Sequence, residues 1–449
     1  MRWRLFPCKS SCHAPDGGAA AATTAAIPVV RRRYILFLLF VVSVFNYIDR
    51  TIISILQVPI KQDLGLSDTQ LGALTGLSFA LFYATLSLPL ARLADRTVRK
   101  RLVASSLAVW SAMTSMTGLA TNFASLVLFR IGVAAGEAGS IPATHSLIAD
   151  LYPPQRRATA LAYWGLSLPV GMMIGYASAG ALAETLGWRA SFAIIGGAGV
   201  LLAPIVWFTM AEPLRGTYDG KLYQPVGTQL TTQQALVFLW RIKSFRYLVA
   251  AGTCHAFAWY SVNAWNAPFY VRAHGMSLGK VALYLAMLNG ICSAIGMYVG
   301  GMLSDRLGAR DVRWRLRIVA VALFLMVPAG LAQYLVASTE LSILFAAITL
   351  TLMLVYYGPI IAVAQLLVPP DLRAFTSAVL MLVLNLFALG LGPLATGYLS
   401  DLLVREYAMT EDSLRYAISV AVMFSLVAGW LFWLASTHLR DDLDANRST

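Results

Sequence analysis

Long runs of apolar residues alternate with short polar segments along most of the chain. Twelve runs can be placed, each long enough to cross the roughly 30 Å hydrocarbon core of a bilayer as a helix. This pattern predicts an all-α membrane protein with twelve transmembrane helices. The runs lie near residues 34–60, 71–91, 102–120, 124–150, 158–183, 190–210, 246–271, 280–303, 317–337, 341–367, 374–399 and 414–436.

The longest polar connection, residues 211–245, falls between the sixth and seventh runs. We interpret it as a cytoplasmic linker between an N-terminal six-helix half, 34–210, and a C-terminal six-helix half, 246–436. Residues 1–33 contain a Gly/Ala/Thr-rich stretch and no apolar core of the signal-peptide type, which predicts a disordered basic tail. Residues 437–449 form a second predicted cytoplasmic tail.

Short motifs recur at equivalent places in the two halves. An Asp-Arg motif at residues 93–96 follows the second run, and a similar one at residues 303–306 follows the eighth. Residues 153–158, PPQRRA, precede the fifth run, and residues 369–374, PPDLRA, precede the eleventh. Because each half has an even number of spans, these landmarks indicate two six-helix units repeated in parallel.

Composition and charge placement agree with a membrane protein. The chain of 449 residues is 58% hydrophobic and only 12% charged, which excludes a soluble globular protein. Its formal net charge of +13 could indicate a nucleic-acid partner, but the lysines and arginines cluster in alternate short loops. That distribution is the orientation signal of a membrane protein, so we expect both termini in the cytoplasm and no nucleic-acid partner. Short outer loops without a glycosylation acceptor favour a bacterial inner membrane.

Motifs for catalysis and cofactors do not emerge from the sequence. No nucleotide-binding loop of the GxxxxGK[ST] form occurs, which disfavours ATP-driven transport. No nucleophile–base constellation stands out, and the four cysteines indicate no disulfide framework. We therefore expect no enzyme activity, no cofactor and no metal.

Two acid–base pairs inside the apolar runs are the strongest functional signal. Asp49 and Arg50 lie in the first run, and Arg130 and Glu137 lie in the fourth. Ionisable residues deep in a bilayer are costly and persist mainly where they face a polar cavity or a partner. At the helical rise, Asp49 and Glu137 both lie about 20 Å from the cytoplasmic edge of their spans. The four residues can therefore form a cluster near mid-membrane, with either a transport role or a purely structural one.

The chemistry of these side chains suggests their roles. Burial favours the protonated form of an acid, whereas a nearby guanidinium favours the carboxylate. If helix movement changes the partners of Asp49, proton binding by Asp49 would depend on the side of the membrane to which the transporter is open. We interpret Asp49 as the proton-coupling residue, with Glu137 assisting. Arg50 or Arg130 would engage an anionic substrate group, because arginine stays charged and grips carboxylate or phosphate with two donors.

The spans of the second half contain almost no formal charge and offer aromatic and amide side chains instead. Because an amide facing lipid is costly, the asparagines are candidates for a substrate cavity. His255 alone is typical of a satisfied core residue. Besides Arg50 and Arg130, the predicted substrate-binding residues are Asn46, Tyr47, Trp259, Asn263, Asn289 and Asn385.

These features resemble a known family. The twelve runs, the Asp-Arg loops and Gly187-Trp188-Arg189 resemble the major facilitator superfamily over about residues 34–436. The loop after the second run departs from the superfamily pattern, because Ala91 and Val98 stand where glycine is usual. The motifs that resemble its spinster branch are Asn46-Tyr47-Ile48-Asp49-Arg50, Arg130 with Gly136-Glu137-Ala138, and Gly390-Leu391-Gly392-Pro393.

The resemblance implies the major facilitator fold and a secondary transporter that works by alternating access. Spinster relatives are associated with sphingolipid-derived and lysophospholipid substrates, which implies an amphipathic, lipid-like anion here. The resemblance also implies a cytoplasmic gate at the helix ends, where acidic side chains lie beside helix N-termini. The alternative is a set of surface salt bridges without a switching role. The predicted gating residues are Asp95, Arg96, Arg157, Asp305, Arg306 and Arg373.

The sequence therefore predicts a proton-coupled transporter that acts as a monomer. Its expected partners are protons, membrane lipids and a small amphipathic or lipid substrate. A transporter of small organic acids or drugs with the same fold is the first alternative. A non-transporting receptor or scaffold is disfavoured because the polar segments are short, and a channel is disfavoured because the charged side chains form no ring.

Overall fold

The computed structural model describes residues 27–215, 231–369 and 372–447, and every regular element in these ranges is a helix. Residues 1–26, which belong to the tail predicted to be disordered, lie outside the described residues. So do residues 216–230 of the predicted linker.

The described helices supply the twelve predicted spans. Nine segments of the described chain are long and apolar enough to cross a membrane. One of them, Thr159–Thr209, has 51 residues, too many for a single crossing, and it breaks at Gly187, where φ is 81°. The break divides this segment into two spans. The less apolar helices α4 (Arg99–Thr117) and α10 (Lys243–His274) supply the remaining two of the twelve.

The N-terminal half contains the first six spans, several of them built from more than one helical element. In chain order they are α1 (Val29–Leu64); α2 (Asp68–Gly72), η1 (Ala73–Leu77) and α3 (Ser78–Arg96); α4; α5 (Phe123–Glu137) and α6 (Ser140–Leu151); and α7 (Pro154–Gly165) with α8 (Ser167–Thr209), which carries both the fifth and the sixth span.

The C-terminal half repeats this plan. Its spans are α10; α11 (Leu278–Met287), η2 (Leu288–Cys292) and α12 (Ser293–Gly308); α13 (Trp314–Leu335); α14 (Thr339–Met353) and α15 (Tyr357–Leu366); α16 (Arg373–Val383), η4 (Leu384–Leu389) and α17 (Gly390–Tyr407); and α18 (Ser413–Arg447). The π-helical turns η1 and η2 lie in the second and eighth spans, which are equivalent in the repeat. Such turns often occur at functional sites.

Helices extend beyond the apolar runs at three places. Helix α1 begins at Val29, so the arginines predicted to precede it lie in its first turns. Helix α18 continues to Arg447, through most of the predicted C-terminal tail. In the predicted linker, a capping box between Thr231 and Gln234 starts the short helix α9 (Thr232–Arg241). A helix does not have to end where its apolar run ends, because polar residues such as arginine are good helix formers.

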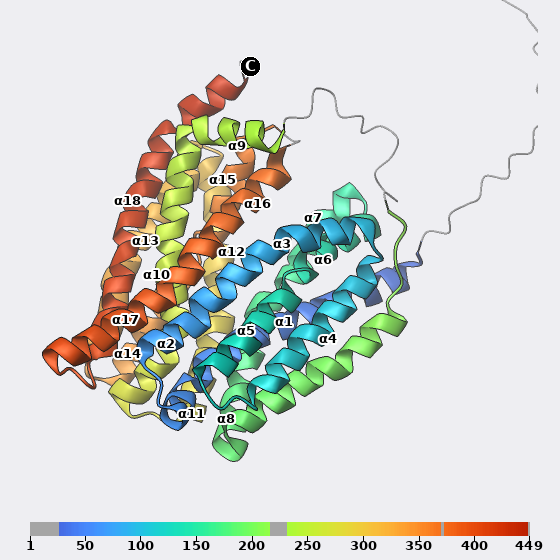
Figure 1. Ribbon diagram of the computed structural model, residues 1–449. Coiled ribbons are helices and arrows are strands. Elements are labelled where there is room, and N and C mark those ends of the chain that lie inside the picture. The colour runs from blue at the N-terminus through green and yellow to red at the C-terminus, as the bar shows by residue number, and fades with distance from the viewer. Residues whose placement is uncertain (1–26, 216–230, 370–371, 448–449) are drawn as a thin grey trace, which may run out of the picture.

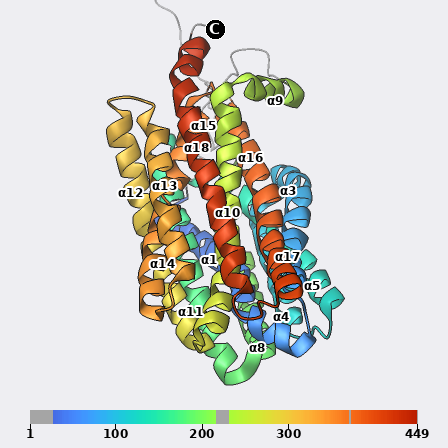
Figure 2. The same ribbon diagram turned by 90° about the vertical axis from the view of Figure 1, so that its left-hand side faces the viewer.

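The two halves form separate bundles that meet mainly at one end of the molecule (Figures 1 and 2). There α2 and η1 pack on α17, and α8 packs on α11. The bundles diverge toward the end that carries the C-terminus, as Figure 1 shows. We call the end that holds α2 and the α17–α18 connection the closed end, and the end that holds the C-terminus the open end.

Helix packing within the N-terminal half depends on glycine in α8. A Cβ added to Gly196 would lie 2.3 Å from the backbone nitrogen of Ser115 on α4, whereas one added to Gly197 would meet nothing within 4 Å. We expect Gly196→Ala to lower the unfolding temperature of the purified protein, because overpacking costs about 1–3 kcal/mol. Gly197→Ala is the matched control and should leave it unchanged or slightly raised. Equal unfolding temperatures for both variants would contradict this packing.

Candidate functional site

A cavity of about 460 Å³ lies between the two halves. The N-terminal half contributes α1, η1, α3 and α5 to α8, and the C-terminal half contributes α10, the tenth span, α16, η4 and α17. The lining includes Thr75 and Pro393, on the elements that join the halves at the closed end, and reaches His145 and Ala378 on α6 and α16. Both halves therefore shape one central space.

One wall of this cavity carries two guanidinium groups that lie close to the same aromatic ring. The guanidinium carbon of Arg50 lies 4.9 Å from the ring centroid of Phe79, and that of Arg130 lies 4.6 Å from it. Arg50 also lies 5.0 Å from the ring of Tyr83. Aromatic faces attract cations, so these rings offset part of the repulsion between two positive charges.

Glu137 neutralises the first of these arginines. The Nε of Arg50 donates to Glu137 Oε2 over 2.9 Å, and its Nη2 lies 2.8 Å from the same oxygen. The Glu137 side chain is fully buried, whereas that of Arg50 keeps 22% exposure. A buried ion pair thus joins α1 to α5 inside the membrane-spanning region.

Asp49 lies behind this wall. It is 2% exposed and lines a small enclosed void together with Arg130 and Thr114. Arg130 lines both this void and the main cavity, so it contacts the space around Asp49 as well as the cavity.

Arg130 and Asp49 are held together only loosely. The Nη1 of Arg130 donates to the backbone oxygen of Asp49 over 3.3 Å, not to its carboxylate. Within the described residues, the Asp49 carboxylate oxygens and the Arg130 Nε are buried without a hydrogen-bond partner. Buried polar groups without partners are costly, so this acid and base are candidates for binding a proton or a ligand.

Four further residues predicted to bind substrate also line the cavity: Tyr47, Trp259, Asn263 and Asn385. Asn385 accepts a hydrogen bond from the Tyr260 hydroxyl over 2.7 Å and donates to the Met381 carbonyl over 2.8 Å. Asn263 donates to the carbonyl of Trp259 over 2.9 Å, and its amide oxygen has no partner in the described chain.

The structure places the other two predicted substrate contacts outside the cavity lining. Asn46 is 4% exposed and faces Glu137. Asn289 is 2% exposed and donates to the Leu285 carbonyl of its own helix over 3.0 Å. An amide can avoid lipid by burial between helices as well as by facing a cavity, so polarity alone did not identify the lining. His255 is the core residue predicted, with its ring nitrogens 2.8 Å from Met353 O and 3.2 Å from Ser425 Oγ.

Sequence reasoning missed several aromatic residues of the wall. Phe79 and Tyr83, which contact the arginines, lie four residues apart and hence on one face of α3. His145 and Trp164 line the cavity and meet edge to face at 5.0 Å. The spacing of Phe79 and Tyr83 was the only available signal, and it is equally typical of a face that meets lipid.

Two of the predicted gating residues, Asp305 and Arg157, make contacts within their own halves. Asp305 lies 3.4 Å from Arg315 of its own half, and Arg157 donates to the Ala149 carbonyl over 2.8 Å. Arg96, Arg306 and Arg373 are exposed, and the side chain of Asp95 lies outside the described residues.

Twelve spans arranged as two repeated bundles around a cavity with an ionisable wall define a membrane transporter. The family model of the Major Facilitator Superfamily matches residues 39–393 of the chain. The chain therefore belongs to this superfamily, and the fold and family predicted from the sequence are confirmed. They are the fold and family of multi-pass membrane transporters, not of enzymes.

Three known proteins are similar to the chain. An MFS-type efflux pump of Mycolicibacterium smegmatis is 35% identical over 402 residues, covering 90% of this chain and 92% of the relative. A probable L-galactonate transporter of Escherichia coli is 30% identical over 279 residues, covering 60% and 61%. The crystal structure of a bacterial homolog to the human lysosomal transporter Spinster, inward-facing and unoccupied, aligns with a TM-score of 0.84 and 31% identity, covering 92% and 99%. The predicted resemblance to the spinster branch is thus confirmed.

The buried pair of Arg50 and Glu137 makes a prediction about stability. Removing one partner of a buried ion pair leaves an uncompensated charge, which costs about 3–5 kcal/mol. We expect Glu137→Gln and Arg50→Gln each to lower the unfolding temperature of the purified protein. The double variant should be less destabilised than the sum of the two, because no unpaired charge remains. Additive losses would show that the two side chains act independently.

Proposed function

We propose that the chain is a proton-coupled secondary transporter that moves an amphipathic, lipid-like anion by alternating access. The division of the cavity wall carries this proposal. Arg50 and Arg130 lie on one side, while aromatic and amide side chains such as Trp259 and Asn385 lie on the other. An anionic headgroup suits the guanidinium groups, and a hydrocarbon chain suits the aromatic surface.

The orientation of the protein follows from charge. The positive-inside rule favours both termini in the cytoplasm of a bacterial inner membrane, so the open end faces inward and the closed end outward. The similarity to an inward-facing structure of a spinster homolog supports this reading. Each monomer contains a complete cavity and is proposed to act alone.

Asp49 is proposed as the proton site. A substrate anion that binds Arg130 would weaken the attraction between Arg130 and Asp49 and would add negative charge nearby. Both effects favour the protonated form of Asp49. The neutral acid could then leave its arginine as the halves rock, so that proton and anion cross together. Glu137 assists by holding Arg50 at the cavity wall.

Small organic acids and drugs remain the second class of substrate. The E. coli relative is described as a probable L-galactonate transporter, and the M. smegmatis relative as an efflux pump. The aromatic surface opposite the arginines favours an apolar tail over a polyhydroxylated acid. Uptake of radiolabelled lysophospholipids, sphingolipid phosphates and sugar acids into liposomes separates these classes. Uptake of sugar acids alone would overturn the lipid assignment.

Asp49→Asn tests the proton role. Asparagine keeps the size of the side chain but cannot bind and release a proton. In liposomes with an imposed pH gradient, we expect this variant to lose gradient-driven accumulation while retaining exchange of labelled for unlabelled substrate. Asp412→Asn, at an exposed position 51% accessible, is the control and should behave as wild type. Accumulation by Asp49→Asn with an unchanged pH dependence would exclude this role.

A further inference from the structure

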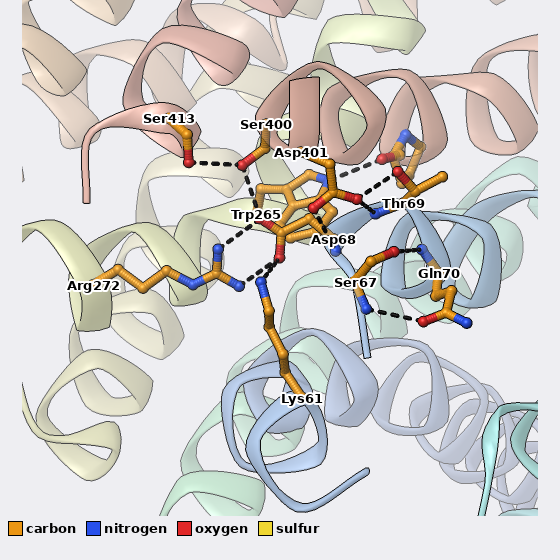
Figure 3. A network of polar contacts seen from close by, with 11 residues as sticks. Lys61, Ser67, Asp68, Thr69, Gln70, Trp265, Arg272, Ser400, Asp401 and Ser413 are labelled. Atoms are coloured by element: carbon orange, nitrogen blue, oxygen red, sulfur yellow. Dashed lines mark hydrogen bonds and ion pairs between the residues drawn. The ribbon is translucent and has the colours of Figure 1, made fainter. Parts of the chain in front are cut away.

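We propose that Asp68 and Asp401 are positioning residues for the transport cycle, because they form a two-way latch that holds the closed end of the cavity shut. This inference rests on the proposed alternating access. It concerns a cluster distinct from the acids and bases of the cavity wall. Figure 3 shows the network, in which residues from α1, α2, α10 and α17 converge.

The first direction of the latch runs from the N-terminal half to the C-terminal half. Asp68, the first residue of α2, is 1% exposed. Its carboxylate accepts two hydrogen bonds from Arg272 of α10, each 2.7 Å, and one from Ser400 of α17 at 2.8 Å. The ammonium nitrogen of Lys61, from α1, is the third partner and lies 2.6 Å from Asp68 Oδ1. This is the bidentate geometry in which arginine binds a carboxylate most strongly.

The second direction runs back from the C-terminal half. The first turn of a helix has backbone N–H groups without helical partners. In α2, the side chain of Ser67 satisfies the N–H of Gln70, which leaves those of Asp68 and Thr69. Asp401 of α17 accepts both of them, over 3.0 and 2.7 Å, and also accepts the Thr69 hydroxyl over 2.6 Å. A carboxylate of one half therefore caps a helix of the other.

Close backbone packing places the latch directly on α17. A Cβ on Gly72 would lie 2.4 Å from Pro393 O, and one on Gly397 would lie 2.3 Å from Asp68 O. Side chains larger than hydrogen would therefore push α2 and α17 apart at these two positions.

The latch is coupled to the cavity through the same stretch of α17. Pro393 lines the cavity, and its carbonyl accepts a hydrogen bond from Trp265 Nε1 over 3.0 Å. Movement of α17 on substrate binding would therefore strain the latch, and release of the latch would move the cavity wall. These hydrogen bonds and ion pairs favour the closed state. They are reversible, because water can hydrate both carboxylates once this end opens.

Distance measurements across the closed end test the latch. Spin labels are attached at Thr121→Cys and Glu411→Cys, exposed positions in the α4–α5 and α17–α18 connections, in a variant without the four native cysteines. The full chain in lipid nanodiscs is measured without substrate. We expect Asp68→Asn and Asp401→Ala each to raise the ratio of long to short distances by about tenfold or more, the scale of one lost charge-assisted hydrogen bond.

Two further variants sharpen the result. Glu406→Gln removes an exposed pair with Arg405 on the same helix and should leave the distances as in wild type. Asp401→Asn keeps one acceptor oxygen and should fall between wild type and Asp401→Ala. If Asp68→Asn fails to fold, the two Asp401 variants decide the question, since Asp401 is only partly buried.

Wild-type distances in folded Asp401→Ala would overturn the latch. Because the measurement uses neither substrate nor a pH gradient, its outcome is independent of the proposed substrate and proton roles. A shifted distance ratio together with failed lipid transport would retain the latch and remove the proposed function. Unchanged distances together with lipid transport would retain the proposed function and remove the latch.

Discussion

The buried ion pair between Arg50 and Glu137 is the contact on which the rest of the site depends. Arg50 and Glu137 neutralise each other, with Arg50 nitrogens 2.8–2.9 Å from Glu137 Oε2. Arg130 is therefore the cation that remains near both Asp49 and the cavity. Phe79 lies against both guanidinium groups and keeps them on one wall. A charge deep in a membrane is costly without a partner, so this pairing accounts for the presence of Arg50 and Glu137 there.

Polar contacts differ between the two ends of the molecule in this conformation. At the closed end, carboxylates of both halves make contacts that cross between them, as with Asp68 and Asp401. Toward the open end, Asp305 pairs with Arg315 of its own half. An alternating-access cycle requires this asymmetry, because one end must be bonded across the halves while the other is not. The cavity wall lies between the two ends and touches α17, the helix that carries Asp401.

Much of the fold and part of the site could be predicted from the sequence, for physical reasons. Apolar runs of bilayer length predict spans, and acids and bases within them predict a cluster, because the membrane makes unpaired charge costly. Which base pairs with which acid depends on helix rotation, so grouping Arg130 with Glu137 by their span did not reveal that Arg50 is the partner of Glu137. Asn289 shows the same limit, because a buried amide can bond to its own helix. Asp68 begins α2, where acidic residues are common, and Asp401 lies within α17, so only the packing of α2 on α17 reveals their contact.

Proton uptake on substrate binding is the most direct test of the link between Asp49 and the substrate anion. The purified protein in weakly buffered solution is mixed with an anionic lysolipid across a series of pH values, and the pH change is followed with an indicator dye. We expect wild type to take up protons as the anion binds, because a negative charge at Arg130 favours protonation of Asp49. Asp49→Asn should bind the lysolipid without proton uptake. Binding to wild type with no proton uptake at any pH, or equal uptake by Asp49→Asn, would contradict this link.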